Sequence, residues 1–87
     1  MNYEIINGKR VMAYDNGGKT ADRYTVALLD GYNSGNFIEC LCMSEFPFHP
    51  MGIGEHSTCM LGRHLGARMA VGDLPDDCIK LVMRDLS

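Results

Sequence analysis

The residues best suited to bind a ligand gather in one stretch, residues 44–66, which holds all three histidines and two of the three prolines. Imidazole and guanidinium groups donate hydrogen bonds to anions, and the guanidinium fork matches phosphate. Two glycines in this stretch would let successive backbone N–H groups point to one side, as in phosphate-binding concavities. The pattern favours a small anionic ligand of the nucleotide class. The predicted ligand-binding residues are Phe48, His49, Gly52, Gly54, His56, Arg63, His64 and Arg68.

A zinc site is an alternative interpretation of the same region. Thiolate and imidazole groups suit zinc, which takes four such ligands in a tetrahedron. The spacing C-x-C-x₆-H-x₆-H-x₂-C differs from that of the usual zinc knuckles, so we expect no bound metal. The five candidate ligands are Cys40, Cys42, His49, His56 and Cys59.

Catalysis and a purely structural role are two further interpretations. Cys59 with His56 would make a nucleophile and base, and His49 with His64 an acid and base. Only Glu55 offers a nearby carboxylate to orient either pair, so we expect no enzymatic activity and no cofactor. In the structural interpretation, the prolines and glycines hold the loop, and its two phenylalanines pack in the core.

Length and charge limit the classes of protein. Eighty-seven residues form a single domain, 1–87, with a core small enough that self-association would help to stabilise it. A net charge of −3 argues against general nucleic-acid binding, which needs a basic surface. The sequence contains neither a signal-peptide pattern nor an apolar run long enough to span a membrane. We therefore expect a cytosolic homo-oligomer without membrane contact.

Alternating apolar residues and turn signals predict two hairpins. The first spans residues 3–14 around Asn7-Gly8, a pair that accepts the positive φ angles of a type I′ turn. Residues 15–20 read as a turn. Residues 23–30 and 36–43 then form the second hairpin, and the latter strand, apolar on nearly both faces, would lie in the middle of the sheet or at a subunit contact.

The last third of the chain predicts one strand and one helix. Residues 64–71 suit a strand, and the helix begins at Asp73 or Leu74, with Pro75 in its first turn. We therefore expect an α+β fold, a small antiparallel sheet of hairpins with one C-terminal helix packed on one face. The apolar stripe of the helix, with Asp85 as its polar interruption, comprises Leu74, Cys78, Leu81, Val82 and Leu86.

The order and spacing of several short motifs carry a family resemblance. They are Asp15-Asn16-Gly17-Gly18, Asp22-Arg23-Tyr24-Thr25-Val26, Pro47-Phe48-His49-Pro50 with Gly52 and His56, His64-Leu65-Gly66 with Arg68, and Asp73-Leu74-Pro75-Asp76-Asp77-Cys78. The chain resembles a group of small, mostly uncharacterised proteins encoded by bacterial viruses. The resemblance implies an accessory viral protein that acts in the cytoplasm of an infected bacterium.

Together, the loop and the resemblance lead to a functional hypothesis. The chain would be a non-enzymatic counter-defence protein that sequesters a small anionic ligand, a nucleotide signal of bacterial immunity. Alternatives are a protein inhibitor that docks directly on a host defence complex, and a small zinc-binding domain. Sequestration requires a closed pocket lined by arginine and histidine, whereas docking requires an exposed apolar or acidic patch.

Overall fold

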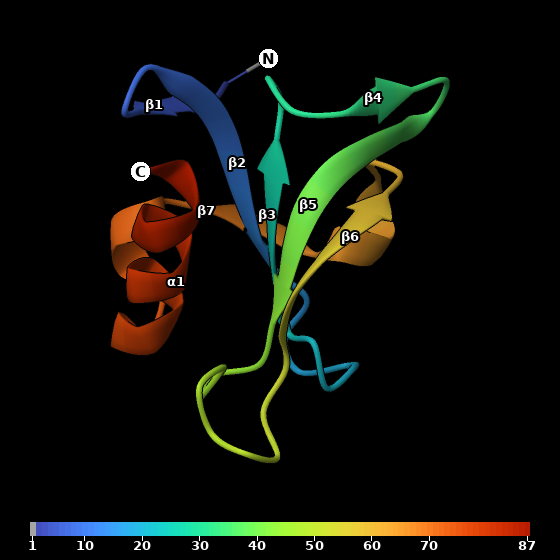
Figure 1. The fold of residues 1–87 in the computed structure, drawn as a ribbon. Helices are drawn as coiled ribbons and strands as arrows, with labels where there is room; N and C mark the ends of the chain where they lie inside the picture. Colours follow the sequence, from blue (N-terminus) through green and yellow to red (C-terminus); the bar gives the residue numbers. More distant parts are fainter. Residues whose placement is uncertain (1) are drawn as a thin grey trace.

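The structure, a computed structural model, describes residues 2–87 as one antiparallel sheet with a C-terminal helix across one face (Figure 1). This arrangement confirms the predicted α+β fold. The described strands are β1 (Glu4–Ile6), β2 (Lys9–Asp15), β3 (Tyr24–Leu28), β4 (Asn33–Ser34), β5 (Phe37–Met43), β6 (Gly54–Cys59) and β7 (Ala67–Met69). Two 3₁₀ turns, η1 (Arg63–Leu65) and η2 (Val71–Asp73), precede the helix α1 (Asp76–Leu86).

The sheet is organised around β5, which pairs with β3 and β4 and also with β6. Strand β2 pairs with β3, and it also pairs with β1 and β7. The predicted first hairpin is confirmed as β1 and β2, and its turn residues Asn7 and Gly8 have φ angles of 51° and 77°. The predicted position of residues 36–43 within the sheet is also confirmed, since β5 has neighbours on both sides.

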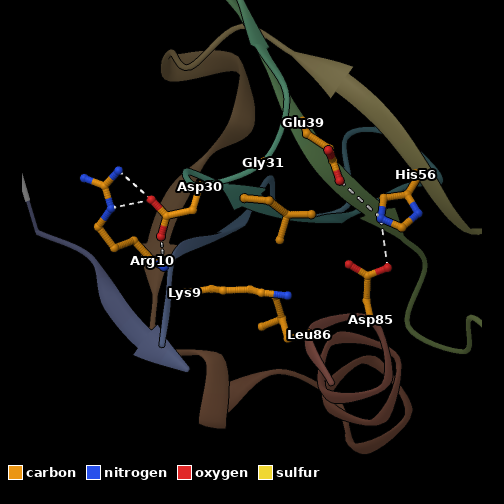
Figure 2. A pocket seen from close by; sticks show the side chains of 9 residues that line it. Lys9, Arg10, Asp30, Gly31, Glu39, His56, Asp85 and Leu86 are labelled. Carbon is orange, nitrogen blue, oxygen red and sulfur yellow. Dashed lines mark hydrogen bonds and ion pairs between the residues drawn. The ribbon is translucent and has the colours of Figure 1, made fainter. Parts of the chain in front are cut away.

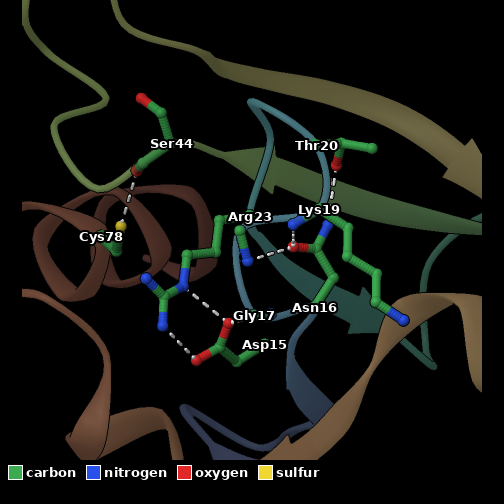
Figure 3. Close-up of polar contacts among 9 residues, drawn as sticks. Asp15, Asn16, Gly17, Lys19, Thr20, Arg23, Ser44 and Cys78 are labelled. Carbon is green, nitrogen blue, oxygen red and sulfur yellow. Dashed lines mark hydrogen bonds and ion pairs between the residues drawn. The ribbon is translucent and has the colours of Figure 1, made fainter.

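The connection between β2 and β3 is a turn held by its own side chains (Figure 3). Asp15 Oδ1 accepts a hydrogen bond from the Gly17 N–H at 2.7 Å, and Asn16 Oδ1 accepts one from the Gly18 N–H at 2.8 Å. Arg23 binds both oxygens of Asp15, at 2.8 and 3.0 Å. The hydrogen bonds from Arg23 and from the Gly17 backbone lower the pKa of Asp15. Residues 15–20 are therefore a turn, as predicted.

The predicted loop at residues 44–66 contains the unexpected strand β6. Its sequence is polar, and all of its residues are exposed except Cys59, which is half-buried. An exposed edge strand has no buried face, so it shows no apolar alternation that sequence analysis could detect. The strand predicted at residues 64–71 is also shorter than expected: Ala67–Met69 pair with β2, while Arg63–Leu65 form η1.

The helical stripe is confirmed as the cover of one sheet face. Cys78, Leu81 and Val82 are buried against residues of β2, β3 and β5. The helix begins later than predicted, at Asp76, because Leu74 precedes a proline and has an extended backbone, with φ −65° and ψ 156°. Pro75 consequently lies at the N-cap. Within residues 2–87, no helix has the length and apolar character needed to cross a membrane.

A second, smaller core lies on the opposite face of the sheet. Met12, Tyr14 and Ala27 pack there with Ile38 of β5 and with Leu65 of η1. The chain between β6 and β7 crosses this face, so β5 is covered on both sides (Figure 1). This double burial explains why β5 is apolar at nearly every position.

Leu81→Ala should lower the free energy of unfolding by about 2–4 kcal/mol, because it removes a large buried side chain from the centre of the main core. Lys80→Ala, one position away on the exposed side, should change it by less than about 0.5 kcal/mol. Urea unfolding curves measure both values. Equal midpoint shifts would contradict the assigned helical face.

Candidate functional site

The predicted ligand-binding residues occupy separate parts of the structure. His56 lines a cavity of about 280 Å³ near the end of α1, and His64 lines one of about 570 Å³ that also contains cysteines of β5 and β6. Arg68 lines a third cavity, of about 440 Å³, where it donates to the Asn2 carbonyl at 2.6 Å and lies over the Tyr14 ring. The structure thus places these three residues at three different cavities.

The His56 cavity is rich in carboxylates (Figure 2). His56 Nε2 lies 2.8 Å from Asp85 Oδ1 and 3.5 Å from Glu39 Oε2, so the imidazole connects β6 to the helix and to β5. Arg10 in the same cavity is paired with Asp30, whose pKa is lowered by the hydrogen bonds from Arg10. Two permanent cations, Lys9 and Arg10, therefore face three carboxylates, an arrangement poorly suited to an anion.

Gly52 and Gly54 do not form the predicted concavity of inward N–H groups. Neither has a positive φ angle, and the Gly52 N–H already donates to the His49 carbonyl at 2.8 Å. Gly54 is the first residue of β6. Glycine is needed at position 52 for space, because a Cβ there would lie 2.0 Å from the Phe46 carbonyl oxygen.

The connection between β5 and β6, residues 44–53, is a preformed loop. Its base is closed by the Ser44 N–H, which donates to the Ile53 carbonyl at 2.8 Å, and by Ser44 Oγ, which accepts from the Ile53 N–H at 2.9 Å. Within the loop, the His49 ring Nδ1 accepts from the Met51 N–H at 3.0 Å. The thiol of Cys78 on α1 lies 3.2 Å from the Ser44 carbonyl and ties the loop to the helix (Figure 3).

This loop presents its apolar side chains to solvent, and we call it the aromatic loop. Phe46, Phe48 and Met51 are 60%, 47% and 87% exposed, so the interpretation that placed the two phenylalanines in the core is wrong. The guanidinium of Arg84 lies 5.3 Å from the centre of the Phe48 ring. The hydrogen bonds of Ser44 and His49 hold the backbone that carries these exposed side chains.

Acidic side chains border the aromatic loop. Glu45 lines a cavity of about 450 Å³ together with Phe46 and with Pro75, Asp76 and Asp77 at the start of α1. Asp76 and Asp77 lie in the first turn of α1, where the positive end of the helix dipole favours acidic residues. Sequence analysis identified Phe48 and His49 in this loop but did not include Asp76 or Asp77 among the binding residues. The loop and its acidic border form the candidate functional site.

Three of the four cysteines lie together on the face of the sheet opposite α1. Cys40 Sγ is 3.7 Å from Cys42 Sγ, and hydrogen bonds with Cys42 and Cys59 raise the pKa of Cys40 while lowering the pKa of both partners. His56 faces the helix instead, so the candidate zinc ligands are not gathered at one point. Among residues 2–87, no group of three or more histidine, cysteine or acidic side chains is placed to hold a metal ion.

Comparisons with protein-family models, with curated proteins and with solved structures found no match. The geometry of the chain itself is therefore the basis for assigning a function.

Gly52→Ala should destabilise the protein by about 1–3 kcal/mol, because its methyl group would overlap the Phe46 carbonyl. Gly72→Ala is the matched control, since a Cβ there meets nothing within 4 Å and should change stability by less than about 0.5 kcal/mol. Urea unfolding compares the two variants. A Gly52→Ala midpoint as high as that of Gly72→Ala would show that the loop is not rigidly built.

The thiols should differ in reactivity with iodoacetamide, which reacts with the thiolate form. Burial and the nearby Asp77 and Glu45 carboxylates raise the pKa of Cys78 to about 11, so little thiolate forms there near pH 8.5, whereas the lowered pKa of Cys42 and Cys59 favours thiolate. Mass spectrometry of timed digests should find Cys42 and Cys59 modified first. Faster labelling of Cys78 in the folded protein would contradict this order.

Proposed function

We propose that this chain is a small viral accessory protein that docks on a protein of the bacterial host through the aromatic loop. The single observation that carries the proposal is that a hydrogen-bonded loop holds Phe46 and Phe48 in water beside an acidic border. Exposed aromatic side chains of this kind are typical anchors of protein interfaces. The viral context comes from the sequence resemblance alone.

The rigidity of the loop supports a binding role. Residues 44–53 are closed at the base, tied to α1 through Cys78 and bonded internally through His49, so little order remains to be acquired on association. Binding surfaces that are already ordered lose less conformational entropy when a partner binds. A few aromatic side chains on such a loop can therefore supply a large part of an interaction energy.

The charge beside the loop indicates the chemistry of the partner. Glu45, Asp76 and Asp77 lie next to Phe46, and the chain as a whole carries a net charge of −3. A complementary surface has an apolar depression bordered by lysine or arginine, and such basic surfaces are common on proteins that handle nucleic acid. A host defence complex that binds nucleic acid therefore fits the proposed partner.

Docking agrees better with the site than sequestration of a small anion does. Sequestration depends on the predicted histidines and arginines meeting in one pocket, but His56, His64 and Arg68 line different cavities. The His56 cavity also has more carboxylates than permanent cations. Docking, in contrast, uses side chains that are already exposed and close together in the loop.

The test is to replace Phe46 and Phe48 together by alanine and to measure host proteins cross-linked to the tagged chain in bacterial cells. Loss of two aromatic anchors should lower recovery of the specific partner at least about tenfold, because each anchor typically contributes more than 1 kcal/mol. The matched control replaces Tyr3 and Tyr32, two exposed aromatic residues elsewhere in the sheet region.

Unfolding curves should show both double variants folded. Equal recovery of the partner with the loop variant and the control would contradict docking through the aromatic loop. Calorimetric titration with linear and cyclic nucleotides separates the alternative, since binding tighter than about 10 μM, near −7 kcal/mol, would favour sequestration.

A further inference from the structure

Strand β6 is an edge strand whose outer side is open. Within residues 2–87 it pairs with β5 and with no other strand, and five of its six residues are exposed. Its sequence, GEHSTC, contains neither proline nor lysine, two residues that commonly protect edges from pairing with another chain. An edge of this length without such protection is suited to pairing with a further strand.

The hydrogen bonds of β5 identify which groups on β6 are free. Ser44 forms hydrogen bonds with the backbone N–H and C=O of Ile53, so these two groups point toward β5. The direction of the backbone groups alternates from one residue to the next along an antiparallel strand, so those of residues 55, 57 and 59 also point toward β5. The Glu39 N–H donates to the Tyr32 carbonyl, on the side of β5 away from β6, which agrees with this alternation. The outward backbone groups of β6 therefore belong to Gly54, His56 and Thr58. Ser57 Oγ lies 3.5 Å from the Thr58 carbonyl oxygen, one of these outward groups.

We propose that β6 pairs in antiparallel fashion with β6 of a second copy of this chain, around a two-fold axis at His56. In this register Gly54 lies opposite Thr58 of the second copy, and the two His56 residues lie opposite each other. All three outward-facing residues of each strand then exchange hydrogen bonds. The product is one continuous sheet with both α1 helices on the same face.

Side chains favour this register over the one whose axis lies one residue away, at Glu55. A shift that puts the axis at Glu55 would place two like carboxylates directly opposite each other, which destabilises an antiparallel pair. With the axis at His56, Glu55 lies opposite Ser57, and Cys59 lies opposite Ile53. The exposed Met60 and Leu61, which follow β6, then lie beside the end of the aromatic loop of the other copy and gain apolar contact.

The pairing is independent of docking on a host protein, because it uses the backbone of β6 and leaves Phe46 and Phe48 outside the strand. His56 keeps its place on the helix side of the sheet, where Asp85 holds its Nε2 at 2.8 Å. If the folded protein dimerises but binds no host partner, the docking proposal fails and the pairing proposal stands. If it binds a host partner as a monomer, the pairing proposal fails and the docking proposal stands.

Sedimentation velocity over a range of concentrations tests the assembly. We expect the wild type to be a dimer at about 0.1 mM, the range of a weak but specific association. Thr58→Pro removes one outward N–H from each half of the interface without removing a bond to β5, so its dimer dissociation constant should rise at least tenfold. Thr58→Val keeps the N–H and should dimerise like the wild type. A monomeric wild type, or equal dimerisation of both variants, would overturn the proposal.

A cysteine pair tests the register even if Thr58→Pro fails to fold. Cα atoms in a hydrogen-bonded antiparallel pair are about 5.5 Å apart, which is within disulfide range. His56→Cys should therefore give a covalent dimer on mild oxidation, identified as a peptide linked between two copies of position 56. Thr58→Cys is the control, because the two copies of position 58 lie four residues out of register and should not link. Linkage at 58 but not at 56 would overturn the proposed axis.

Discussion

Strand β5 is the constraint on which the rest of the structure depends. It is bonded along both edges and packed on both faces, with Leu41 and Met43 toward α1 and Ile38 toward the smaller core. Because side chains alternate along a strand, one register decides what lies on each face. The helix contact of His56 and the gathering of three thiols on the other face both follow from that register.

Sequence patterns predict this protein well where a face is buried. The hairpins, the apolar character of β5 and the helical stripe all arise from burial, which imposes a period of two on strands and of about 3.6 on helices. Strand β6 has no such imprint, because five of its six residues are exposed. The sequence therefore predicts a long loop at these six residues, although their backbone continues the sheet.

The candidate site was predictable in part. Proline, glycine and aromatic residues identified the region of the loop, and Phe48 belongs to the site as it stands. The grouping of histidines and arginines in the sequence wrongly suggested one shared pocket. Residues that are close in the sequence lie on different elements here or point to opposite faces of the sheet. His56 contacts the helix, whereas His64, in the 3₁₀ turn η1, lines a cavity that includes Cys59. The acidic border combines a loop residue with the start of α1, a long-range contact that composition cannot reveal.

The pairing of β2 with β7 bears on how the chain folds. Ala13 lies opposite Met69, the Val71 N–H donates to Glu4 at 2.8 Å, and Gly66 passes so close to Asp15 that a Cβ would lie 2.0 Å from its carbonyl oxygen. The N-terminal hairpin thus completes its contacts with residues more than fifty positions later. Such non-local pairing slows folding, because a large loop must close before the contacts form. During synthesis on the ribosome, the first hairpin would therefore lack its contacts with β7 until the end of the chain is made. Its apolar face would stay accessible to chaperones until α1 emerged.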